Sequence, residues 1–454
     1  MKWKEKKVLV VGCGISGISA SLLLEKKEAL PILFDENTKV NIEIIKERLG
    51  EESKVRVITG QLPREILSEL DFVVLSPGVP CDSSFVNDLK EKNLPIIGEV
   101  ELAYLCGKGK ILAITGTNGK TTTTALVGKI IEGYYSSSFI VGNIGLPYTD
   151  KAKEMTEDSV TVAEISSFQL ETTHEFHPQV TAILNITPDH LDRHHTMEEY
   201  IRTKIKIAQN QKKEDTCVIN YEIPYRKMIE ERCPAKIVYF SSQRKLEDGY
   251  YLEGKTIRFA GKGEVTDLLH LDEIKLLGVH NAENVMAAIA MTESFGVDRN
   301  HILQTVKEFT SVEHRIEYVD TINGVAYYND SKGTNPDASI KAVEAMPGPT
   351  LLIGGGYDKN SSYDEWIDSF SGKVKLLVLF GQTREKIADC AKKHGFHHII
   401  IVDTLEEAVL ECYKNAKEGD CVLLSPACAS WGMFANYEVR GKQFKEDVKK
   451  LKES

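Results

Sequence analysis

Short apolar runs, each ending in turn residues, alternate along the chain with stretches of helical spacing. In the first hundred residues these runs are 7–11, 32–35 and 71–75, and residues 19–27 have the spacing of a helix. Continuous apolar runs of this length indicate strands buried on both faces, as in a parallel sheet covered by helices. We therefore predict that the chain begins with a doubly wound α/β domain.

The same alternation continues through the middle of the chain. Runs at 111–114, 160–165 and 180–186 predict strands, and residues 200–210 and 285–294 predict helices. Residues 215–275 read as short strands and turns without any concentration of chemical groups. The helix at 200–210 carries Arg202, Lys204 and Lys206, each of which taken alone would be interpreted as facing solvent.

The last part of the chain predicts a second doubly wound sheet. Its strands are expected at 325–329, 350–353, 375–380, 398–402 and 421–424, with helices between them. The charged run 442–454 predicts a solvated helix. We predict an α/β protein of three domains: a Rossmann-like domain at 1–98, a P-loop ATPase-like α/β domain at 99–311 and a Rossmann-like domain at 312–454.

Composition narrows the class of protein. The chain has 454 residues and a formal net charge of −11, which argues against nucleic acid or an anionic membrane surface as the main partner. Its nine cysteines form no C-x-x-C pair, so we expect reduced thiols in the cytoplasm. Glycines interrupt the first apolar run, and no run approaches the roughly 18 residues of a spanning helix. We therefore expect neither a signal peptide nor a membrane span.

The stretch with the clearest chemistry is ILAITGTNGKTTTT at 111–124. A strand that breaks into a glycine-rich turn before a helix presents backbone N–H groups to phosphate. Lys120 adds a positive charge for the terminal phosphates, and the hydroxyl of Thr121 suits Mg²⁺. The loop departs from the strict pattern, since Ile114 occupies the place of the first glycine. We still predict a nucleotide site formed by Gly116, Thr117, Asn118, Gly119, Lys120, Thr121 and Thr122.

A second glycine motif follows the first strand. G-x-G-x-x-G at 12–17 lies between a predicted strand and a predicted helix, and Asp35 ends the next strand. This pattern indicates a nucleotide or phosphate ligand but does not by itself specify a dinucleotide. Ser76 and Gly78 belong to a turn at the carboxyl end of strand 71–75, where open α/β sheets bind ligands.

Ionisable residues gather at strand ends in the central domain. Glu164 ends one strand, where a carboxylate could hold Mg²⁺ directly or through water. Residues 187–195 follow the next strand and include His190, two further histidines and two aspartates. The histidines leave zinc open as an alternative, but the surrounding oxygen ligands favour Mg²⁺ or Mn²⁺.

Further candidate groups lie near the third domain. Asn281 and Asn284, next to the Ala-rich helix, could offer amides to a purine edge, and N-capping explains one of them but not both. In the third domain, ligand groups are expected where strands end, around 330–336, 354–359 and 425–430. We interpret the cluster of His394, His397 and His398 as structural.

Taken together, these motifs resemble those of the Mur ligase family, and the resemblance covers essentially the whole length of the chain. The family's motifs occur in order as GTNGKT (116–121), GNIG (142–145), EISSFQLE (164–171), DHLDRH (189–194), HNAEN (280–284) and EHR (313–315). Three more resemble the branch that adds D-glutamate: VVGCGISG (10–17), NDSKGTNPDA (329–338) and LLSPACASWGMF (423–434).

The resemblance implies an ATP-dependent amide ligase of peptidoglycan precursor synthesis. Such an enzyme adds D-glutamate to UDP-N-acetylmuramoyl-L-alanine through an acyl-phosphate intermediate. The implied cofactors are ATP and Mg²⁺ at two sites, with Mn²⁺ possible, and Lys204 would be carbamylated. The partners are then small molecules only, with no nucleic acid and no membrane, and we expect a monomer.

The resemblance also assigns roles to individual residues. The UDP-substrate residues are Gly14, Ile15, Ser16, Asp35, Ser76, Gly78, Asn143 and Gln169. Asn281, Asn284, Arg315 and Asp330 join the phosphate loop as ATP contacts. The metal ligands are Thr121, Glu164, His190 and carbamylated Lys204, and the catalytic set is Lys120, His190, Lys204 and Lys332. Thr334, Lys359, Ser430 and Tyr437 surround D-glutamate, Tyr437 standing where the family usually has Phe.

Three alternative functions each fail to account for some of the motifs in the chain. A folate polyglutamate synthase shares the ATP core but should lack the uridine-type first domain. A nicotinamide-dependent dehydrogenase would use residues 12–17 but leave the phosphate loop, Glu164 and His190 unexplained. A non-catalytic nucleotide-binding module would not need the NDSKGTN motif.

Overall fold

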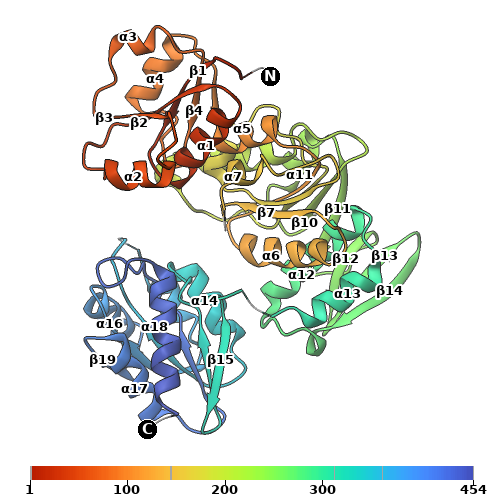
Figure 1. Ribbon diagram of the computed structural model, residues 1–454. Coiled ribbons are helices and arrows are strands. Elements are labelled where there is room, and N and C mark those ends of the chain that lie inside the picture. Colours follow the sequence, from red (N-terminus) through yellow and green to blue (C-terminus); the bar gives the residue numbers. More distant parts are fainter. Residues whose placement is uncertain (1–2, 144–145, 311, 360, 453–454) are drawn as a thin grey trace. The chain divides into compact units, whose positions relative to one another are not determined.

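The computed structural model describes residues 3–143, 146–310, 312–359 and 361–452. Within these residues the strands form three sheets that follow one another along the chain, and Figure 1 traces them from red to blue. Residue contacts divide the chain into two compact units. The first comprises the residues up to Leu271 together with Glu283–Val306, and the second comprises Asp272–Ala282 and the residues from Lys307 onward.

The first sheet is parallel, with strand order β3-β2-β1-β4-β5. Its strands are β1 (Lys7–Val11), β2 (Leu30–Asp35), β3 (Arg56–Thr59), β4 (Phe72–Leu75) and β5 (Ile96–Gly98). Its helices are α1 (Ile15–Lys26), α2 (Ile42–Leu49), α3 (Arg64–Leu67) and α4 (Ser84–Glu91). The strand order reverses at β1, so a crevice for a ligand is expected where β1 and β4 end.

Alternate residues of β1 serve two different cores. Val8 belongs to the same core as Leu23 of α1, whereas Leu9 belongs to the same core as Leu89 of α4. Successive side chains of a strand point to opposite faces, so a strand covered on both sides must be apolar throughout. This arrangement explains the continuous apolar run that predicted β1.

The central sheet has the order β14-β13-β12-β11-β10-β9-β6-β8-β7. Its strands are β6 (Lys110–Thr115), β7 (Ser138–Gly142), β8 (Val160–Glu164), β9 (Val180–Ile183), β10 (Thr216–Asn220), β11 (Lys236–Ser241), β12 (Gly249–Glu253), β13 (Thr256–Gly261) and β14 (Glu264–His270). The strands from β7 to β12 pair in parallel, and β13 and β14 extend the edge as an antiparallel pair. The phosphate-loop strand β6 lies between β8 and β9.

Helices and short helical turns connect these strands. They are α5 (Glu99–Cys106), α6 (Lys120–Glu132), α7 (Tyr148–Lys151), α8 (Ser167–Leu170), α9 (Leu191–His194), α10 (Met197–Ile205), η1 (Lys206–Ala208), α11 (Arg226–Arg232), η2 (Leu271–Glu273), α12 (Val279–Ser294) and α13 (Arg299–Glu308). Since β6, β8 and β9 are parallel neighbours, the residues that follow them emerge at one edge of the sheet.

The third sheet has the order β15-β16-β20-β17-β18-β19. Its strands are β15 (Glu317–Ile322), β16 (Val325–Asn329), β17 (Thr350–Gly354), β18 (Val374–Leu379), β19 (Ile399–Ile401) and β20 (Cys421–Leu424), and all pair in parallel except the edge strand β15. Its helices are α14 (Pro336–Ala345), α15 (Asp364–Asp368), α16 (Arg384–Lys393), α17 (Leu405–Asn415) and α18 (Tyr437–Lys450). Leu352 and Trp366 share one core and Ile353 and Phe444 share another, so helices cover both faces.

Several predicted elements differ from the structure. The helix after the glycine motif begins at Ile15, and α12 begins at Val279, so the HNAEN residues lie inside that helix rather than before it. The strand after residue 180 ends at Ile183. The antiparallel strand β15 was not predicted, because its charged and exposed residues give no apolar run.

The last helix corrects the prediction of a solvated charged run. Helix α18 begins at Tyr437 and buries Phe444, Asp447 and Val448. Its charged residues cover only the outer side, while the apolar positions complete the core beneath α17 and the sheet. Among the described residues, no helix combines the length and apolar character that crossing a bilayer requires.

Candidate active site

The phosphate loop has the geometry that its sequence predicts. Gly119 caps α6 with φ of 83°, in the left-handed region that glycine adopts without steric cost. A Cβ atom there would come 2.3 Å from Oδ1 of Asn284. The Lys120 ammonium bends back over the loop and donates to the carbonyls of Gly116 at 2.8 Å and Thr117 at 2.9 Å. The loop is therefore closed around its own lysine beside a helix N-terminus.

A residue that sequence analysis did not single out fixes the loop's shape. Asn185, just after β9, accepts from the Asn118 amide at 2.8 Å and donates to the Asn118 carbonyl at 3.0 Å. The Thr117 hydroxyl contacts the Tyr200 hydroxyl at 3.1 Å. A neutral amide after a strand gives no signal in sequence, but its position at the same sheet edge as the loop could have suggested the role.

Lys204 is buried, not solvent-facing as its position in a basic helix suggested. Its side chain is 1% exposed, and its Nζ donates to the Gly116 carbonyl at 2.9 Å. It lies over the Tyr200 ring at 4.7 Å. Burial, and then the charge of Lys120, lower the pKa of Lys204 well below its usual value. An amine that favours its uncharged form is nucleophilic, which carbamylation by CO₂ requires.

Glu164 ends β8 with an orphaned carboxylate oxygen. The residue is 1% exposed, its Oε1 accepts from Asn143 Nδ2 at 2.7 Å, and its Oε2 is buried without a hydrogen-bond partner. A buried, half-satisfied carboxylate is costly unless a cation or another donor completes it. Asn143 follows β7, while Ile144 and Gly145 of the GNIG motif lie outside the described residues.

The histidine-rich segment after β9 separates into different roles. His190 has φ of 52° and an exposed side chain, whose Nε2 lies 3.5 Å from Asp189 Oδ2. His194 is buried instead, and its Nε2 contacts the Ser167 hydroxyl at 2.9 Å. Burial lowers the pKa of His194. Of these two histidines, His190 is thus the one whose side chain a ligand can reach, and His194 has a structural role in the interior.

All eight residues predicted for the UDP substrate line one pocket of about 590 Å³. Gly14, Ile15 and Ser16 come from the start of α1, and Ser76 and Gly78 from the turn after β4. Asp35 ends β2, and Asn143 and Gln169 come from the central domain. The strand ends that sequence analysis selected separately thus meet, and Asn143 connects this pocket to Glu164.

Backbone contacts shape the wall of this pocket. A Cβ atom on Gly17 would lie 1.8 Å from the Gly12 carbonyl oxygen, so only glycine allows α1 to pack this closely. The Asp35 carboxylate accepts from the backbone amides of Cys13 at 2.9 Å and Asn37 at 2.9 Å. Asp35 therefore stabilises the glycine turn itself.

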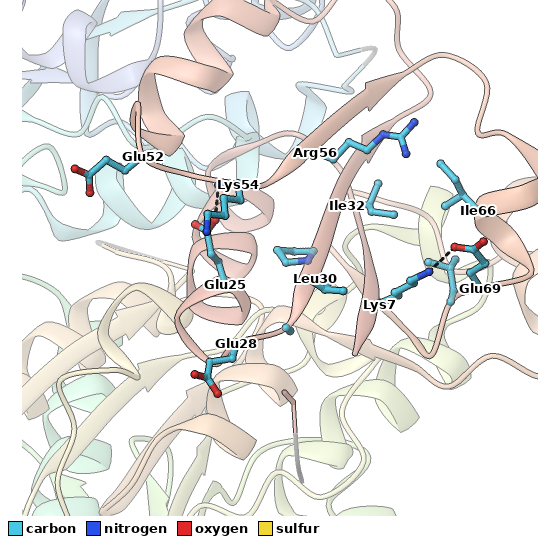
Figure 2. A pocket seen from close by; sticks show the side chains of 13 residues that line it. Lys7, Glu25, Glu28, Leu30, Ile32, Glu52, Lys54, Arg56, Ile66 and Glu69 are labelled. Carbon is cyan, nitrogen blue, oxygen red and sulfur yellow. Dashed lines mark hydrogen bonds and ion pairs between the residues drawn. The ribbon is translucent and has the colours of Figure 1, made fainter. Parts of the chain in front are cut away.

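Another pocket, of about 600 Å³, lies in the first domain and contains none of the predicted residues. Its lining includes Lys7 and Leu30, at the starts of β1 and β2, the ends opposite to those that form the UDP-substrate pocket. Figure 2 shows Lys7 directed to Glu69, with which it forms an ion pair of 2.5 Å. Parallel sheets bind ligands at their carboxyl ends, so we assign no role in the reaction to this pocket.

The two asparagines of α12 have different surroundings. Asn281 Nδ2 donates to the Leu277 carbonyl at 2.7 Å, and Asn284 Oδ1 accepts from Thr123 Oγ1 at 3.3 Å. Asn284 thus joins α12 to the helix of the phosphate loop. Neighbouring His280 is half-buried, and its partial burial, with the charge of Arg315, lowers its pKa to about 4.

Asp330 and Arg315 belong to a buried polar cluster at the end of β16. Asp330 is 4% exposed, and its Oδ2 accepts from Ser425 Oγ at 2.7 Å. Burial raises the pKa of Asp330 to about 7, against the opposing hydrogen bond from Ser425 and the charge of Arg315. Arg315 Nε is buried without a hydrogen-bond partner.

Lys332 and Tyr437, both assigned by resemblance to the same step, lie next to each other. The Lys332 ammonium lies 5.3 Å from the centre of the Tyr437 ring. Arg440, one turn further along α18, is fully buried and donates to the Ser331 carbonyl at 2.8 Å and the Cys428 carbonyl at 3.2 Å. Arg440 therefore holds the loops after β16 and β20 together. The sequence did not indicate this role, because Arg440 is one of many charged residues in its helix.

Lys359 lies close to the residue that follows Ser430. The Lys359 ammonium lies 5.3 Å from the centre of the Trp431 ring, and Trp431 follows the buried Ser430. Tyr357 N donates to the Ala429 carbonyl at 2.9 Å, which joins the loops after β17 and β20. Thr334 lies in the loop after β16. The predicted D-glutamate residues therefore come from three adjacent strand ends of one sheet.

Comparison with known proteins identifies the family. The chain is 56% identical over 451 residues to UDP-N-acetylmuramoylalanine–D-glutamate ligase of Lachnospira eligens, covering 99% of this chain and 100% of the relative. It is 46% identical over 453 residues to the enzyme of the same name from Clostridioides difficile, with 100% of both chains covered. The chain belongs to the Mur ligase family. The family predicted from sequence, and its ligase class, are confirmed.

Family models match each part of this Mur ligase. Residues 6–98 match the Mur ligase MurD-like N-terminal domain, 114–292 the Mur ligase middle domain and 314–428 the Mur ligase glutamate ligase domain. The predicted three-domain α/β fold is thereby confirmed.

Solved structures share the fold. A UDP-N-acetylmuramate–alanine ligase from Thermotoga maritima superimposes with a TM-score of 0.60 at 19% identity, covering 98% of this chain and 99% of that chain. A MurF ligase from the same organism, solved in complex with ADP, gives a TM-score of 0.58 at 17% identity, covering 99% and 96%.

Proposed function

We propose that this Mur ligase joins D-glutamate to UDP-N-acetylmuramoyl-L-alanine at the expense of ATP, in the synthesis of peptidoglycan precursors. The observation that carries the proposal is the 2.7 Å hydrogen bond from Asn143 to Glu164. Asn143 lines the pocket of the first domain, and Glu164 ends the strand beside the phosphate loop. One residue thus links a nucleotide-sized pocket to the groups that handle phosphate.

The substrate pocket suits a uridine nucleotide whose acyl end extends toward Glu164. Its assigned residues are Gly14, Ile15, Ser16, Asp35, Ser76, Gly78, Asn143 and Gln169, and their convergence in one pocket supports the assignment. The substrate carboxylate attacks the γ-phosphate of ATP, which gives an acyl phosphate and ADP. The amine of D-glutamate then attacks the acyl carbon and expels phosphate.

The phosphate-loop residues hold ATP in this proposal. Lys120 neutralises phosphate charge, and the residues from Gly116 to Thr122 donate backbone and hydroxyl groups. Asn281 and Asn284 are assigned to adenosine, and Arg315 and Asp330 to ATP contacts from the C-terminal domain. The buried Arg315 Nε, which lacks a hydrogen-bond partner, supports a role for Arg315 in meeting an anion.

The residues around Glu164 fit Mg²⁺. The orphaned Oε2 of Glu164 supports a cation there, with Thr121 as the second ligand of the first site. His190 and carbamylated Lys204 are assigned to the second site, and the lowered pKa of Lys204 supports its reaction with CO₂. When bound, Mg²⁺ or Mn²⁺ neutralises the charge that moves during phosphoryl transfer.

The third domain supplies the amino-acid site. Lys332, held beside Tyr437, is assigned to charge stabilisation in the second step, and Thr334, Lys359, Ser430 and Tyr437 to the D-glutamate carboxylates. We place the domain boundaries at 1–98, 99–311 and 312–454, supported by family models at 6–98, 114–292 and 314–428. We also propose a cytoplasmic monomer; nine free thiols suit a reducing compartment.

The test is ADP release from ATP and Mg²⁺ with UDP-N-acetylmuramoyl-L-alanine and one amino acid. Turnover is expected with D-glutamate and not with L-glutamate, L-alanine or a diamino acid. Turnover with another amino acid alone would assign the chain to a different step. Turnover with none of them, but with a folate and glutamate, would overturn the proposal.

A matched pair of variants tests the connection between the two half-sites. Asn143→Ala removes the hydrogen bond to Glu164, whereas Ser83→Ala alters the rim of the same pocket and no group of the phosphate site. We expect the first variant to lower kcat and the second to leave kcat unchanged. Equal effects of the two on kcat would remove the support that this hydrogen bond gives.

A further inference from the structure

Two helices of the C-terminal domain face each other with metal-ligand side chains that the ligase reaction does not use. Helix α15 carries Asp364 and Asp368, and α16 carries Cys390 with His394 just after its last residue. In each pair the residues are four apart, which places them on one side of their helix. Sequence analysis interpreted His394 as structural; the structure shows what surrounds it.

Three of these side chains converge on one point. His394 Nε2 lies 2.9 Å from Asp364 Oδ1, and Cys390 Sγ lies 3.8 Å from the same oxygen. The three ligand atoms all lie within 4.8 Å of one another. Ligands around tetrahedral zinc are about 3.3–3.6 Å apart, given its bond lengths of about 2.0–2.3 Å. The two separations from Asp364 Oδ1 are within about half an ångström of this spacing, and side-chain rotations of up to about an ångström would admit the ion.

Outer hydrogen bonds orient two of the three ligands. His394 Nδ1 contacts Asp368 Oδ1 at 2.6 Å, which fixes the ring and directs Nε2 toward Asp364. The Ser362 hydroxyl donates to Asp364 Oδ2 and leaves Oδ1 facing the histidine. A carboxylate on the far nitrogen of a metal-bound histidine is a recurring feature of zinc sites.

The carboxylates of this cluster outnumber the cationic side chains that pair with them. Among the described residues, the ion pairs of Asp364 and Asp368 are made with His394 alone. The cluster of Glu313, His314 and Glu317 differs, because Lys445 pairs with both of its glutamates. A lysine thus neutralises the second cluster, whereas within the described part of the chain no lysine or arginine forms an ion pair with Asp364 or Asp368.

The packing beneath the cluster holds its helices in place. Trp366 and Ile367 of α15 and Ile387 and Ala391 of α16 belong to one buried core. The ligands therefore stand on elements whose spacing is set by packing, as a preorganised site needs.

We propose that Asp364, Cys390 and His394 bind one zinc ion or a similar divalent ion of intermediate softness, with Asp368 as the positioning residue of His394. The set of one oxygen, one sulfur and one nitrogen ligand suits Zn²⁺ and Co²⁺ rather than Mg²⁺. Binding replaces two protons by the metal, the thiol proton of Cys390 and the Nε2 proton that faces Asp364, and releases both to solvent. The ion joins α15 to α16 and thereby stabilises the C-terminal domain.

Cobalt is the probe, because thiolate bound to Co²⁺ absorbs in the near ultraviolet. The full chain, freed of metal and kept in excess Mg²⁺ to occupy oxygen-rich sites, is titrated with CoCl₂. We expect a thiolate absorption that saturates at one equivalent and disappears when ZnCl₂ displaces cobalt. Cys390→Ser should abolish this absorption, and His394→Gln should weaken binding at least about tenfold.

Controls separate this site from other cysteines and from misfolding. Cys81→Ser alters another half-buried cysteine, in the first domain, and should leave the cobalt absorption unchanged. Asp368→Asn should weaken binding about 10- to 100-fold without removing the thiolate absorption. Each variant's melting temperature without metal is compared with that of the parent, and ZnCl₂ should raise Tm in the parent but not in Cys390→Ser.

Two results would overturn the proposal. One is the absence of thiolate absorption at one equivalent of Co²⁺ in the parent protein. The other is an absorption that persists in Cys390→Ser, which would assign the metal to another cysteine. Ligase activity is measured in parallel without zinc, and its presence or absence does not bear on this site.

Discussion

At the scale of single residues, Lys204 connects burial to chemistry most directly. Its ammonium form is disfavoured by burial and by Lys120, and its nitrogen contacts the Gly116 carbonyl of the phosphate loop. Arginine would keep a positive charge there but cannot form a carbamate. We expect Lys204→Arg to lower kcat for ADP release by about a hundredfold or more, the scale of losing one charge-stabilising group.

The control for Lys204 lies on the same stretch of chain. Lys206 Nζ donates to the Glu171 carbonyl at 2.9 Å, and Lys206→Arg should leave kcat within about twofold. Removing dissolved CO₂ should lower the activity of the parent protein, and bicarbonate should restore it. Full activity of Lys204→Arg would contradict the carbamate assignment.

Asp330 predicts a pH dependence of stability. Its pKa rises from 3.8 to about 7 on folding because burial disfavours the charged form. The folded state therefore holds this proton more tightly than the unfolded state, so the contribution of Asp330 to stability is greatest below pH 4 and declines as pH rises to about 7. Above that pH it stays constant.

Asp330→Asn should remove this decline, since asparagine can still accept from Ser425 but does not ionise. The measurement is the urea midpoint of both proteins between pH 5 and pH 8. We expect the midpoint of the parent to fall relative to that of the variant up to about pH 7 and to run parallel above it. Parallel curves over the whole range would show that Asp330 does not titrate there.

At the scale of elements, the sequence predicted those strands best whose composition is determined by burial alone. Strands β1, β16 and β20 coincide with the predicted residues because burial on both faces makes them continuously apolar. Strand β15 escaped prediction because an edge strand is half exposed and tolerates charge. Helix α18 was misread because its outer charges outnumber the few residues that complete the core.

The residues of the candidate site likewise separate into those that could be predicted from sequence and those that could not. Gly14, Asp35 and Ser76 could be placed together because parallel strands end at one edge of a sheet. Asn185, Arg440 and the burial of Lys204 could not, because each depends on contacts between segments far apart in sequence. A polar residue's environment is a tertiary property that its neighbours in sequence do not carry.

Two glycines of the same motif give a prediction for the element α1. A Cβ atom on Gly17 would meet the Gly12 carbonyl at 1.8 Å, whereas one on Gly14 would meet nothing within 4 Å. We expect Gly17→Ala to lower the free energy of unfolding by about 1–3 kcal/mol, because the backbone of β1 and α1 must separate. Gly14→Ala should cost less, about 0.5–1 kcal/mol, because alanine is a poorer N-cap residue than glycine.

Urea unfolding of the two variants measures this difference, and binding of UDP shows its effect on the pocket. The larger movement of α1 in Gly17→Ala should weaken UDP binding severalfold. Equal stabilities of the two variants would mean that α1 accommodates the added methyl group without moving.

At the scale of the whole molecule, the proposed ligand groups are divided between two compact units. The UDP-substrate residues all belong to the first unit, and Lys332, Lys359, Ser430 and Tyr437 all belong to the second. A ligand stabilises those parts of a protein whose folded form it binds. UDP alone should therefore slow amide hydrogen exchange around residues 12–17 and 76–79 and leave residues 312–452 unchanged.

The complete set of ligands should act on both units. With a non-hydrolysable ATP analogue, UDP-N-acetylmuramoyl-L-alanine and D-glutamate, we expect slower exchange also at residues 329–334 and 428–437. The first segment contains Lys332 and Thr334, and the second contains Ser430 and Tyr437, so protection requires the amino-acid site to be occupied. Hydrogen exchange followed by mass spectrometry resolves these segments. Protection of the second unit by UDP alone, or its absence with all three ligands, would contradict the division of the substrate sites between the two units.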